Sequence, residues 1–285
     1  MTNSNSSNSP YILEMRNVSK TFPGVKALDQ INLRVKRGSV HALMGENGAG
    51  KSTLMKILYG IYIPDEGGEL ILDDKPFKPG RPIDAIRRGL TMVPQEISPA
   101  ANLTIADNFY LGREITKGKF FLNQKAMNEQ ASAILKELGV PMDVTEKMSD
   151  VSVAKAQLVA IATAVSNDAK VIIMDEPTTA LTENEVEQLY RIIETVKARG
   201  IAIIFISHKL DEVFRVSDEI TVIRDGQYVD TKPTKEVTKE QLISMMVGRD
   251  MSEMFQRERF ELSDEIVLEI KHFTREGKYQ DINFA

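Results

Sequence analysis

The feature that most constrains this chain is a glycine-rich segment between a short apolar run and a helical pattern. It fits G-x-x-x-x-G-K-[ST], follows the apolar residues 40–44 and precedes helical spacing over 53–59. A dense polyanion is bound by several backbone N–H groups that converge on it, and glycines let the chain wrap closely enough to bring them together. The positive N-terminus of a following helix adds to the attraction. The segment predicts a strand, a phosphate-binding loop and a helix, with a purely structural turn as the alternative. The loop residues are Gly45, Glu46, Asn47, Gly48, Ala49, Gly50, Lys51, Ser52 and Thr53.

Two loop side chains carry specific expectations. Lys51 is expected to reach the β- and γ-phosphates of a nucleotide, and the Ser52 hydroxyl to bind Mg²⁺.

Short runs rich in Val and Ile alternate with helical patterns along most of the chain, which predicts the α/β class. Continuous apolar runs such as VIIM and IAIIFI suit strands buried on both faces of a parallel sheet. The predicted strands cover residues 40–44, 91–93, 171–174, 201–206 and 219–223.

Helix signals complete this pattern. Thr182 and Glu185 form a capping box that opens a helix over residues 183–199, and a second box opens a helix over 239–247. Between about 102 and 165 the strand signals vanish and helical spacing appears, which predicts a helical subdomain inserted into the sheet domain. Its clearest helix carries Met127, Ala131, Ile134 and Leu138.

Two carboxylates, Asp175 and Glu176, come directly after the buried run 171–174. Ligands collect at the carboxyl ends of parallel strands, so this pair is expected to stand beside the phosphates. Asp175 suits a Mg²⁺ shell, and Glu176 is placed to polarise a water for in-line attack on the γ-phosphorus. The alternative is a solvated acidic pair at a strand end.

Three further residues are candidates for a functional role, and each also has an ordinary structural explanation. His208 follows the strand over 201–206, where a structural histidine is the commoner case. Gln95 follows another short strand and is either a turn residue or a Mg²⁺ ligand that senses the γ-phosphate. Phe22 precedes a Pro-Gly turn and either stacks on adenine or makes a core contact.

Composition narrows the function classes. The chain has 36 Lys and Arg against 41 Asp and Glu, for a net charge of −5, which argues against a nucleic-acid partner. It has no Cys, which excludes disulfides, thiolate metal sites and cysteine nucleophiles. Its three His leave little from which to build a protein-only transition-metal site. The start has no signal-peptide pattern, and no apolar run approaches the roughly 18 residues of a membrane span, so any membrane role is expected to be peripheral.

An internal repeat appears near the end of the chain. Ile-Leu-Glu-Met-Arg at 12–16 recurs as Val-Leu-Glu-Ile-Lys at 267–271, and Ile-Asn-Leu at 31–33 recurs as Ile-Asn-Phe at 282–284. We expect a disordered tail over 1–10, one domain over 11–250, a linker over 251–263 and the truncated start of a second domain over 264–285. Two unrelated amphipathic strands are the alternative.

The ordered set of Phe22, GENGAGKST, Gln95, a helical insert, DEP at 175–177 and His208 resembles the nucleotide-binding domain of ABC transporters, over residues 11 to about 250. FPGVKALD, DEPTTALTENEV, VIRDGQ and MMVGR are similar to the first half of the tandem ATPase subunits of bacterial monosaccharide importers, the galactose/methyl-galactoside and ribose members in particular. The resemblance implies a P-loop fold with a mainly parallel core sheet, an antiparallel β subdomain and a helical subdomain.

Residue by residue, the resemblance makes Phe22 the adenine-stacking aromatic and Gln95 the lid glutamine that links the nucleotide to the transmembrane partner. Asp175 becomes the Mg²⁺ carboxylate, Glu176 the catalytic base and His208 the γ-phosphate switch. It implies ATP and Mg²⁺ as cofactors and a peripheral place at the cytoplasmic face of the membrane. The implied partners are transmembrane permease subunits, a periplasmic or extracellular sugar-binding protein acting indirectly, and a second nucleotide-binding domain in cis or in a dimer.

The sequence departs from this family pattern in two places. Residues 151–155 read Val-Ser-Val-Ala-Lys where the family has Leu-Ser-Gly-Gly-Gln, so the glycines that approach the facing γ-phosphate are missing and the site completed by this segment is expected to be weak or inactive. Thr182 stands where an Asp usually follows Ala-Leu, and its role as a helix N-cap accounts for it.

These observations predict an ATPase that drives monosaccharide import through a separate membrane subunit. Alone, the chain is expected mostly to bind the nucleotide. Two alternatives stay open, a soluble ABC ATPase that acts on nucleic acid or ribosomes and a nucleotide-sensing module without turnover.

Overall fold

The computed structural model describes residues 9–118, 121–248 and 268–285. The chain divides into two compact units, Met1–Arg249 and Asp250–Ala285, which we treat separately. The expected linker at 251–263 lies outside the described residues, as does all but the end of the expected tail at 1–10.

The first unit is built on a ten-stranded sheet in the order β5-β4-β1-β2-β12-β11-β3-β10-β9-β6. Strands β3, β6, β9, β10 and β11 pair parallel with one another in this core, whereas β11 pairs antiparallel with β12, and β1 pairs antiparallel with β2 and β4. The strands are β1 (Tyr11–Phe22), β2 (Val25–Lys36), β3 (Val40–Met44), β4 (Glu69–Leu72), β5 (Lys75–Pro76), β6 (Leu90–Val93), β9 (Val171–Asp175), β10 (Ala202–Ile206), β11 (Glu219–Arg224) and β12 (Gln227–Pro233). The five strands predicted from apolar runs are all present within one or two residues.

The central strands are covered on both faces, which explains their continuous apolar runs. In β9, Val171 and Ile173 pack in the hydrophobic cluster that contains helix α1 (Lys51–Leu58) and strands β1 and β2. Their neighbours Ile172 and Met174 point to the other face, into the cluster formed with helices α5 (Val153–Val165) and α6 (Glu183–Ala198). The phosphate-loop helix therefore lies on one side of the core sheet and the longer helices lie on the other.

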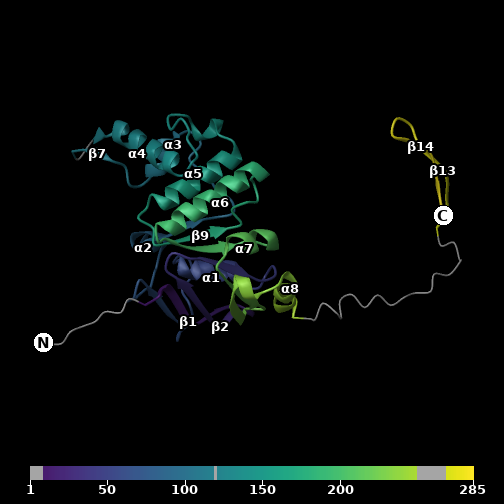
Figure 1. Cartoon of the computed structure of the whole chain (residues 1–285), viewed down its shortest axis with the longest axis horizontal. Coiled ribbons are helices and arrows are strands. Elements are labelled where there is room, and N and C mark those ends of the chain that lie inside the picture. Colours follow the sequence, from purple (N-terminus) through teal and green to yellow (C-terminus); the bar gives the residue numbers. More distant parts are fainter. Residues whose placement is uncertain (1–8, 119–120, 249–267) are drawn as a thin grey trace. The chain divides into compact units, whose positions relative to one another are not determined.

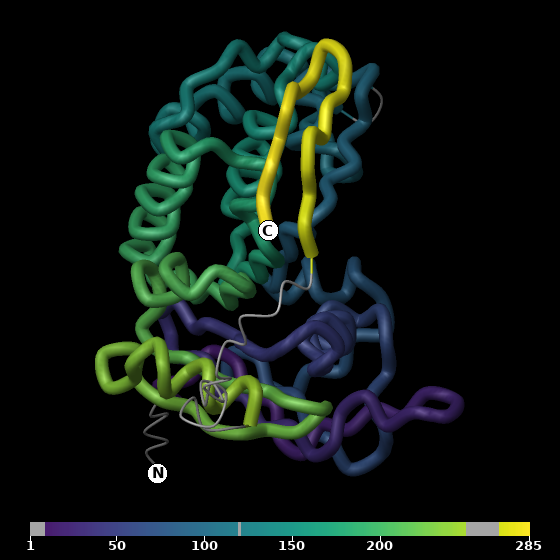
Figure 2. Tube along the Cα trace, turned by 90° about the vertical axis from the view of Figure 1, so that its right-hand side faces the viewer, coloured from purple at the N-terminus to yellow at the C-terminus, as the bar shows by residue number. Residues whose placement is uncertain are grey.

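The remaining helices complete the first unit. They are α2 (Pro82–Arg87), α3 (Ile105–Tyr110), α4 (Gln124–Glu137), α7 (Leu210–Val216) and α8 (Lys239–Val247), with 3₁₀ turns η1 (Met148–Asp150) and η2 (Thr234–Glu236). Figure 1 shows α3, α4 and α5 together at the end of this unit that lies away from β1 and β2, and Figure 2 shows the same separation from the side. In the described residues no helix is both long and apolar enough to cross a membrane.

The capping signals give the expected helix starts. At α6 the Thr182 N–H donates to Glu185 Oε2 at 2.9 Å, and at α8 the Thr238 N–H donates to Gln241 Oε1 at 3.0 Å. Helix α1 begins at Lys51 rather than at Thr53, because the loop already turns into the helix at Gly50, whose φ is 103°. Lys51 and Ser52 thus occupy the first turn of the helix.

The region 102–165 contains α3, α4, η1 and α5, but it is not free of strands. Two-residue strands β7 (Thr116–Lys117) and β8 (Phe121–Leu122) pair antiparallel there. Strand signals are absent from the sequence here because such a short ladder needs no apolar periodicity. Both residues of each strand are exposed.

The second unit has one described feature, the antiparallel hairpin of β13 (Ile270–Arg275) and β14 (Tyr279–Phe284). It repeats the β1–β2 hairpin in detail. The His272 N–H donates to Asn283 Oδ1 at 2.7 Å, as the Asn17 N–H donates to Asn32 Oδ1 at 3.1 Å.

The agreement extends to backbone conformation. Asn17 and Gln30 have φ near +51°, and the equivalent His272 and Asp281 have φ of 53° and 52°. Non-glycine residues rarely adopt this conformation, so the two hairpins share an uncommon backbone feature at matching positions. The two hairpins differ in how far their apolar residues are buried. Leu13 and Val18 are buried, whereas their counterparts Leu268 and Phe273 are exposed.

Candidate functional site

The glycine-rich segment forms a loop between β3 and α1, anchored to the turn that follows β11. Gly45 has φ of 156°, and a Cβ added there would lie 2.2 Å from the carbonyl oxygen of Ile223. The Gly226 N–H donates to the Ala49 carbonyl at 3.1 Å. The sequence needs glycine at position 45 because any side chain would collide with the Ile223 carbonyl oxygen near the end of β11.

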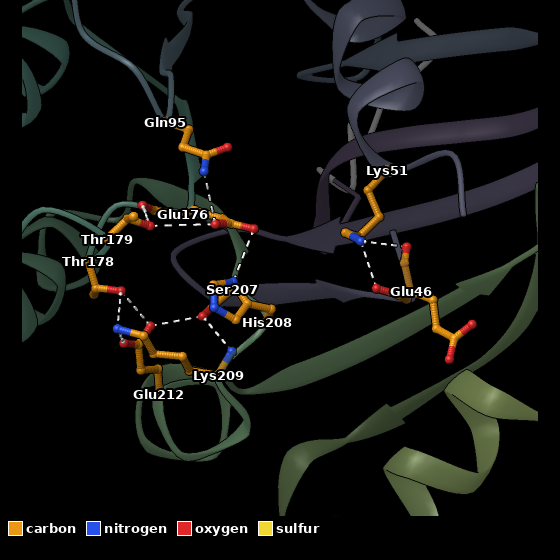
Figure 3. A network of polar contacts seen from close by, with 11 residues as sticks. Glu46, Lys51, Gln95, Glu176, Thr178, Thr179, Ser207, His208, Lys209 and Glu212 are labelled. Carbon is orange, nitrogen blue, oxygen red and sulfur yellow. Dashed lines mark hydrogen bonds and ion pairs between the residues drawn. The ribbon is translucent and has the colours of Figure 1, made fainter. Parts of the chain in front are cut away.

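Lys51 lies across the loop that precedes it. Its ammonium donates to the carbonyl oxygens of Gly45 at 2.6 Å and Glu46 at 3.0 Å (Figure 3). Burial lowers the pKa of Lys51, while the nearby carboxylates of Glu176 and Asp175 act in the opposite direction. The cation is thus held by backbone oxygens of its own loop.

The loop and both carboxylates line one cavity of about 240 Å³. Six consecutive loop residues, from Gly48 to Thr53, contribute to it together with Asn47. Gln95 after β6 and the Asp175-Glu176 pair at the end of β9 form the opposite side. Gly45 and Glu46 do not line the cavity, and their contribution is the pair of carbonyl oxygens that hold Lys51. The lining is completed by Ala27 and Ile206, which sequence reasoning did not single out.

Asp175 is the last residue of β9 and lies half-buried in this cavity. Burial raises its pKa, and the negative charge of Glu176 adds to the effect, while Lys51 and Lys56 oppose it. A carboxylate whose charge is disfavoured by its surroundings is stabilised by a bound cation.

Glu176 is the centre of a small set of polar contacts that Figure 3 displays. Its Oε2 accepts from Gln95 Nε2 at 3.2 Å, and its Oε1 lies 3.2 Å from His208 Nδ1. Thr179 Oγ1 donates to the Glu176 carbonyl oxygen at 3.1 Å. Three residues predicted separately, Gln95, Glu176 and His208, are therefore brought together.

The backbone of Glu176 is strained. Its φ is 46°, a left-handed conformation that costs a non-glycine residue energy and occurs preferentially at functional sites. Its N–H donates to the Ile206 carbonyl oxygen at 2.9 Å, which fixes the turn against the end of β10. Glu176 itself lines the cavity.

Phe22 is not among the residues that line the cavity. Its half-buried ring packs edge-on against Tyr62, with ring centroids 5.2 Å apart, and Lys20 lies 5.4 Å from its centroid. The core-contact alternative does not describe this position, and the adenine contact stays a prediction.

The donor set fits a nucleotide polyphosphate with a hard divalent cation. A loop of backbone amides, an ammonium and a helix N-terminus suit phosphate oxygens. Oxygen donors from Ser52, Gln95 and Asp175 line the same cavity, and Mg²⁺ prefers one or two protein oxygens together with water and phosphate.

Thr179 and a buried carboxylate, Glu212, are functional candidates that sequence reasoning missed. Thr179 lies in a Thr-Thr pair, which in a sequence is typical of an ordinary turn and indicates no function. Glu212 lies in the first turn of a helix, where an acidic residue normally reads as a surface partner of the helix dipole. No sequence signal shows that it is buried.

Comparison with known proteins identifies the family. The family described as ABC transporter matches residues 28–179, which is more than half of the chain and includes the loop and both carboxylates. The chain belongs to the ABC transporter family. This confirms the resemblance drawn from the motifs.

Curated relatives agree along nearly the whole chain. A galactose/methyl galactoside import ATP-binding protein of Mannheimia succiniciproducens is 48% identical over 280 residues, 98% of this chain and 55% of its own length. A Geobacillus kaustophilus protein named for ribose, galactose and methyl galactoside import is 47% identical over 275 residues, 96% of this chain and 54% of its own length. The chain thus spans about half the length of the curated relatives it matches.

Solved structures confirm the fold. An ATP-binding cassette of an ABC transporter in its ADP conformation superposes with a TM-score of 0.72 at 26% identity, covering 86% of this chain and 98% of its own. A nucleotide-free ATP-binding cassette gives a TM-score of 0.71 at 26% identity and covers 84% of this chain and 96% of its own. The predicted P-loop fold of the ABC type is confirmed.

Proposed function

We propose that this chain binds ATP with Mg²⁺ and takes part in ATP hydrolysis that powers the import of a monosaccharide through a separate membrane permease. The observation that carries the proposal is that Lys51, Gln95, Asp175 and Glu176 converge on one cavity in a member of the ABC transporter family. The names of its relatives support a galactose, methyl galactoside or ribose importer.

Each side of the cavity has a proposed task. Lys51 and the loop amides bind the phosphates, and Phe22 stacks on the adenine. Glu176 accepts a proton from the attacking water, and His208 contacts the γ-phosphate. Phosphoryl transfer asks the protein mainly for positioning and charge, which this arrangement supplies.

Ser52, Gln95 and Asp175 are the residues proposed to hold Mg²⁺. The ion, when bound, neutralises charge on the β- and γ-phosphate oxygens. The raised pKa of Asp175 supports its place here, because a cation beside it offsets both its burial and the charge of Glu176.

The permease is proposed to contact the chain near Gln95. A second cavity of about 260 Å³ is lined by Pro94, Ile97 and Pro99 from the segment around Gln95 and by Val159 and Thr163 of α5. Movement of a partner in this cavity would displace Gln95, whose side chain donates a hydrogen bond to Glu176. The chain would then act at the cytoplasmic face of the membrane, with a periplasmic or extracellular sugar-binding protein as an indirect partner.

A second nucleotide-binding domain, in cis or in a dimer, is the other proposed partner. The β13–β14 hairpin supports this because it repeats the bonds and the backbone conformation of β1–β2, the hairpin that opens the first domain. The chain also covers only about half of each curated relative. We propose that residues 264–285 belong to the start of that second domain.

The segment at 151–155 supports an unequal pair of sites. Ser152 caps α5, and its hydroxyl accepts from the Lys155 N–H at 3.3 Å, while the Val153 side chain is 66% exposed. A branched side chain at this position hinders the close backbone approach that glycine permits. We propose that this segment serves a facing γ-phosphate poorly.

Calorimetric titration of MgATP into the wild type and Lys51→Ala tests the proposal. The variant is expected to bind at least about 10-fold more weakly, because it loses a charge-assisted contact to phosphate. Lys125→Ala, on the exposed face of α4, is the control, and thermal unfolding checks that all three proteins are folded. Undiminished affinity in Lys51→Ala would remove the loop from the function.

A nucleotide-sensing role without turnover is the second candidate, favoured by the altered 151–155 segment. Phosphate release by the chain alone and by the chain together with a second nucleotide-binding half separates the two. Turnover only with the second half supports transport-linked hydrolysis, whereas binding without phosphate release in both supports sensing. Co-purification with nucleic acid instead of a membrane protein would support the nucleic-acid alternative.

A further inference from the structure

A buried carboxylate outside the cavity joins the two loops that carry Glu176 and His208. Glu212 lies in the first turn of α7 and is 7% exposed. Its Oε2 accepts from Thr178 Oγ1 at 2.9 Å and from Ser207 Oγ at 2.9 Å, as Figure 3 shows. Its Oε1 lies 3.1 Å from the Lys209 ammonium.

The two hydroxyl donors belong to different loops. Thr178 lies two residues after Glu176 in the loop that follows β9, and Ser207 immediately precedes His208 in the loop that follows β10. One oxygen atom therefore bonds to both loops. It does so beside the 3.2 Å contact between Glu176 Oε1 and His208 Nδ1.

The chemistry of this position favours a carboxylate. All of its observed partners are donors, namely two hydroxyls and one ammonium. An ionised carboxylate only accepts, whereas a glutamine amide would direct an NH₂ group toward one of these donors. A buried charge persists when it is paired and hydrogen-bonded, and Glu212 meets both conditions.

We propose that Glu212 is a positioning residue that sets the placement of His208 relative to Glu176. This rests on the proposed ATPase function, in which those two residues act at the γ-phosphate. Glu212 itself does not line the nucleotide cavity. Its action is on the two loops, whose separation its carboxylate fixes.

Histidine NMR of the full chain tests the proposal without depending on turnover. The chain has three His, so selective labelling reports on His41, His208 and His272. In Glu212→Gln the His208 imidazole signals are expected to shift while those of the other two stay in place. Glu187→Gln is the matched control, because Glu187 also pairs with α7, through Arg215 at 2.6 Å, but on an exposed surface.

Ser207→Ala provides a second variant that leaves the buried charge and its Lys209 partner intact. It removes the donor on the His208 loop and is expected to move the same His208 signals. If His208 keeps its wild-type signals in folded samples of both variants, the proposal is overturned. If wild-type protein shows no response to MgATP, the proposed function fails instead, independently of Glu212.

Phosphate release in a single-turnover assay of the chain together with a second nucleotide-binding half adds a second readout. Glu212→Gln is expected to slow release by about 10- to 10²-fold, the scale of losing a positioning group, with its MgATP affinity nearly unchanged. In a His208→Ala background the same substitution is expected to cost much less, since the loop no longer carries the group it positions. If the two substitutions instead slow phosphate release independently, so that their fold-changes multiply in the double variant, a role of Glu212 through His208 would be contradicted.

Discussion

The two sides of the nucleotide cavity are built by different means. The loop side, residues 45–53, is held by backbone. Gly45 lies against the Ile223 carbonyl, Ala49 bonds to Gly226, and Lys51 is held by loop carbonyl oxygens. The carboxylate side is held by side chains, with Glu176 meeting Gln95, His208 and Thr179. The side held by backbone contacts comes from one contiguous stretch of sequence with a recognisable pattern. The side held by side-chain contacts is assembled from single residues that lie far apart in the sequence.

The largest expected effect comes from the carboxylate side. Glu176→Gln is expected to lower turnover by about 10²- to 10⁴-fold, the range for loss of a general base, and to leave nucleotide binding intact because the loop side is untouched. Phosphate release by the chain together with a second nucleotide-binding half, and MgATP titration of the chain, check both parts. Glu129→Gln, exposed on α4, is the control. A parallel loss of affinity would show that the two sides are not separable.

The next prediction concerns folding of the loop side. Gly45→Ala is expected to lower the free energy of unfolding by about 3 kcal/mol, since its Cβ would meet the Ile223 carbonyl oxygen and overpacking and left-handed strain add. Gly48→Ala is expected to cost only about 1 kcal/mol, because its φ is also positive but no atom lies within 4 Å of the added Cβ. Chemical denaturation measures both, and equal costs would contradict the close approach at Gly45.

This difference explains what could be predicted from the sequence. The loop, its strand and its helix follow from one contiguous motif, and the Asp175-Glu176 pair follows from the rule that ligands collect at strand ends. The link between Gln95 and Glu176 needs the three-dimensional sheet order, in which β6 lies beside β9. Glu212 could not be found, because only packing distinguishes a buried acidic residue from an exposed one in the first turn of a helix.

A third prediction concerns His41, in the strand that leads into the loop. It is fully buried, and its Nε2 contacts Thr221 Oγ1 at 2.7 Å. Its Nδ1 has no hydrogen-bond partner and lies 3.9 Å from Glu219 Oε2. Burial lowers the pKa of His41 from 6.5 to about 4, and the Lys36 charge adds to this. The unfolded chain thus binds this proton first as the pH falls, so the free energy of unfolding decreases between pH 6.5 and about 4.

At about 1.4 kcal/mol per pKa unit, the loss contributed by His41 approaches about 3 kcal/mol at the acid end of this window. His41→Gln is expected to flatten the dependence by about one proton, measured by denaturation at several pH values. His272→Gln, which removes an exposed imidazole, is the control. An unchanged slope in His41→Gln would mean that the buried imidazole does not resist protonation.

The smallest expected effect tests how much the hydrogen bond from Thr179 to the Glu176 backbone contributes to turnover. Thr179→Val removes the hydroxyl that supports the strained Glu176 backbone, and one hydrogen bond is worth about 1 kcal/mol, which corresponds to about a 5-fold fall in turnover. Thr195→Val is the matched control, because Thr195 also donates to a backbone carbonyl, that of Arg191 at 2.8 Å, but on the exposed face of α6. Phosphate release under saturating MgATP, measured with a second nucleotide-binding half present, separates the two. An equal effect in both variants would mean that Thr179 stabilises only the fold, and that the left-handed turn at Glu176 is fixed by its N–H bond to Ile206 alone.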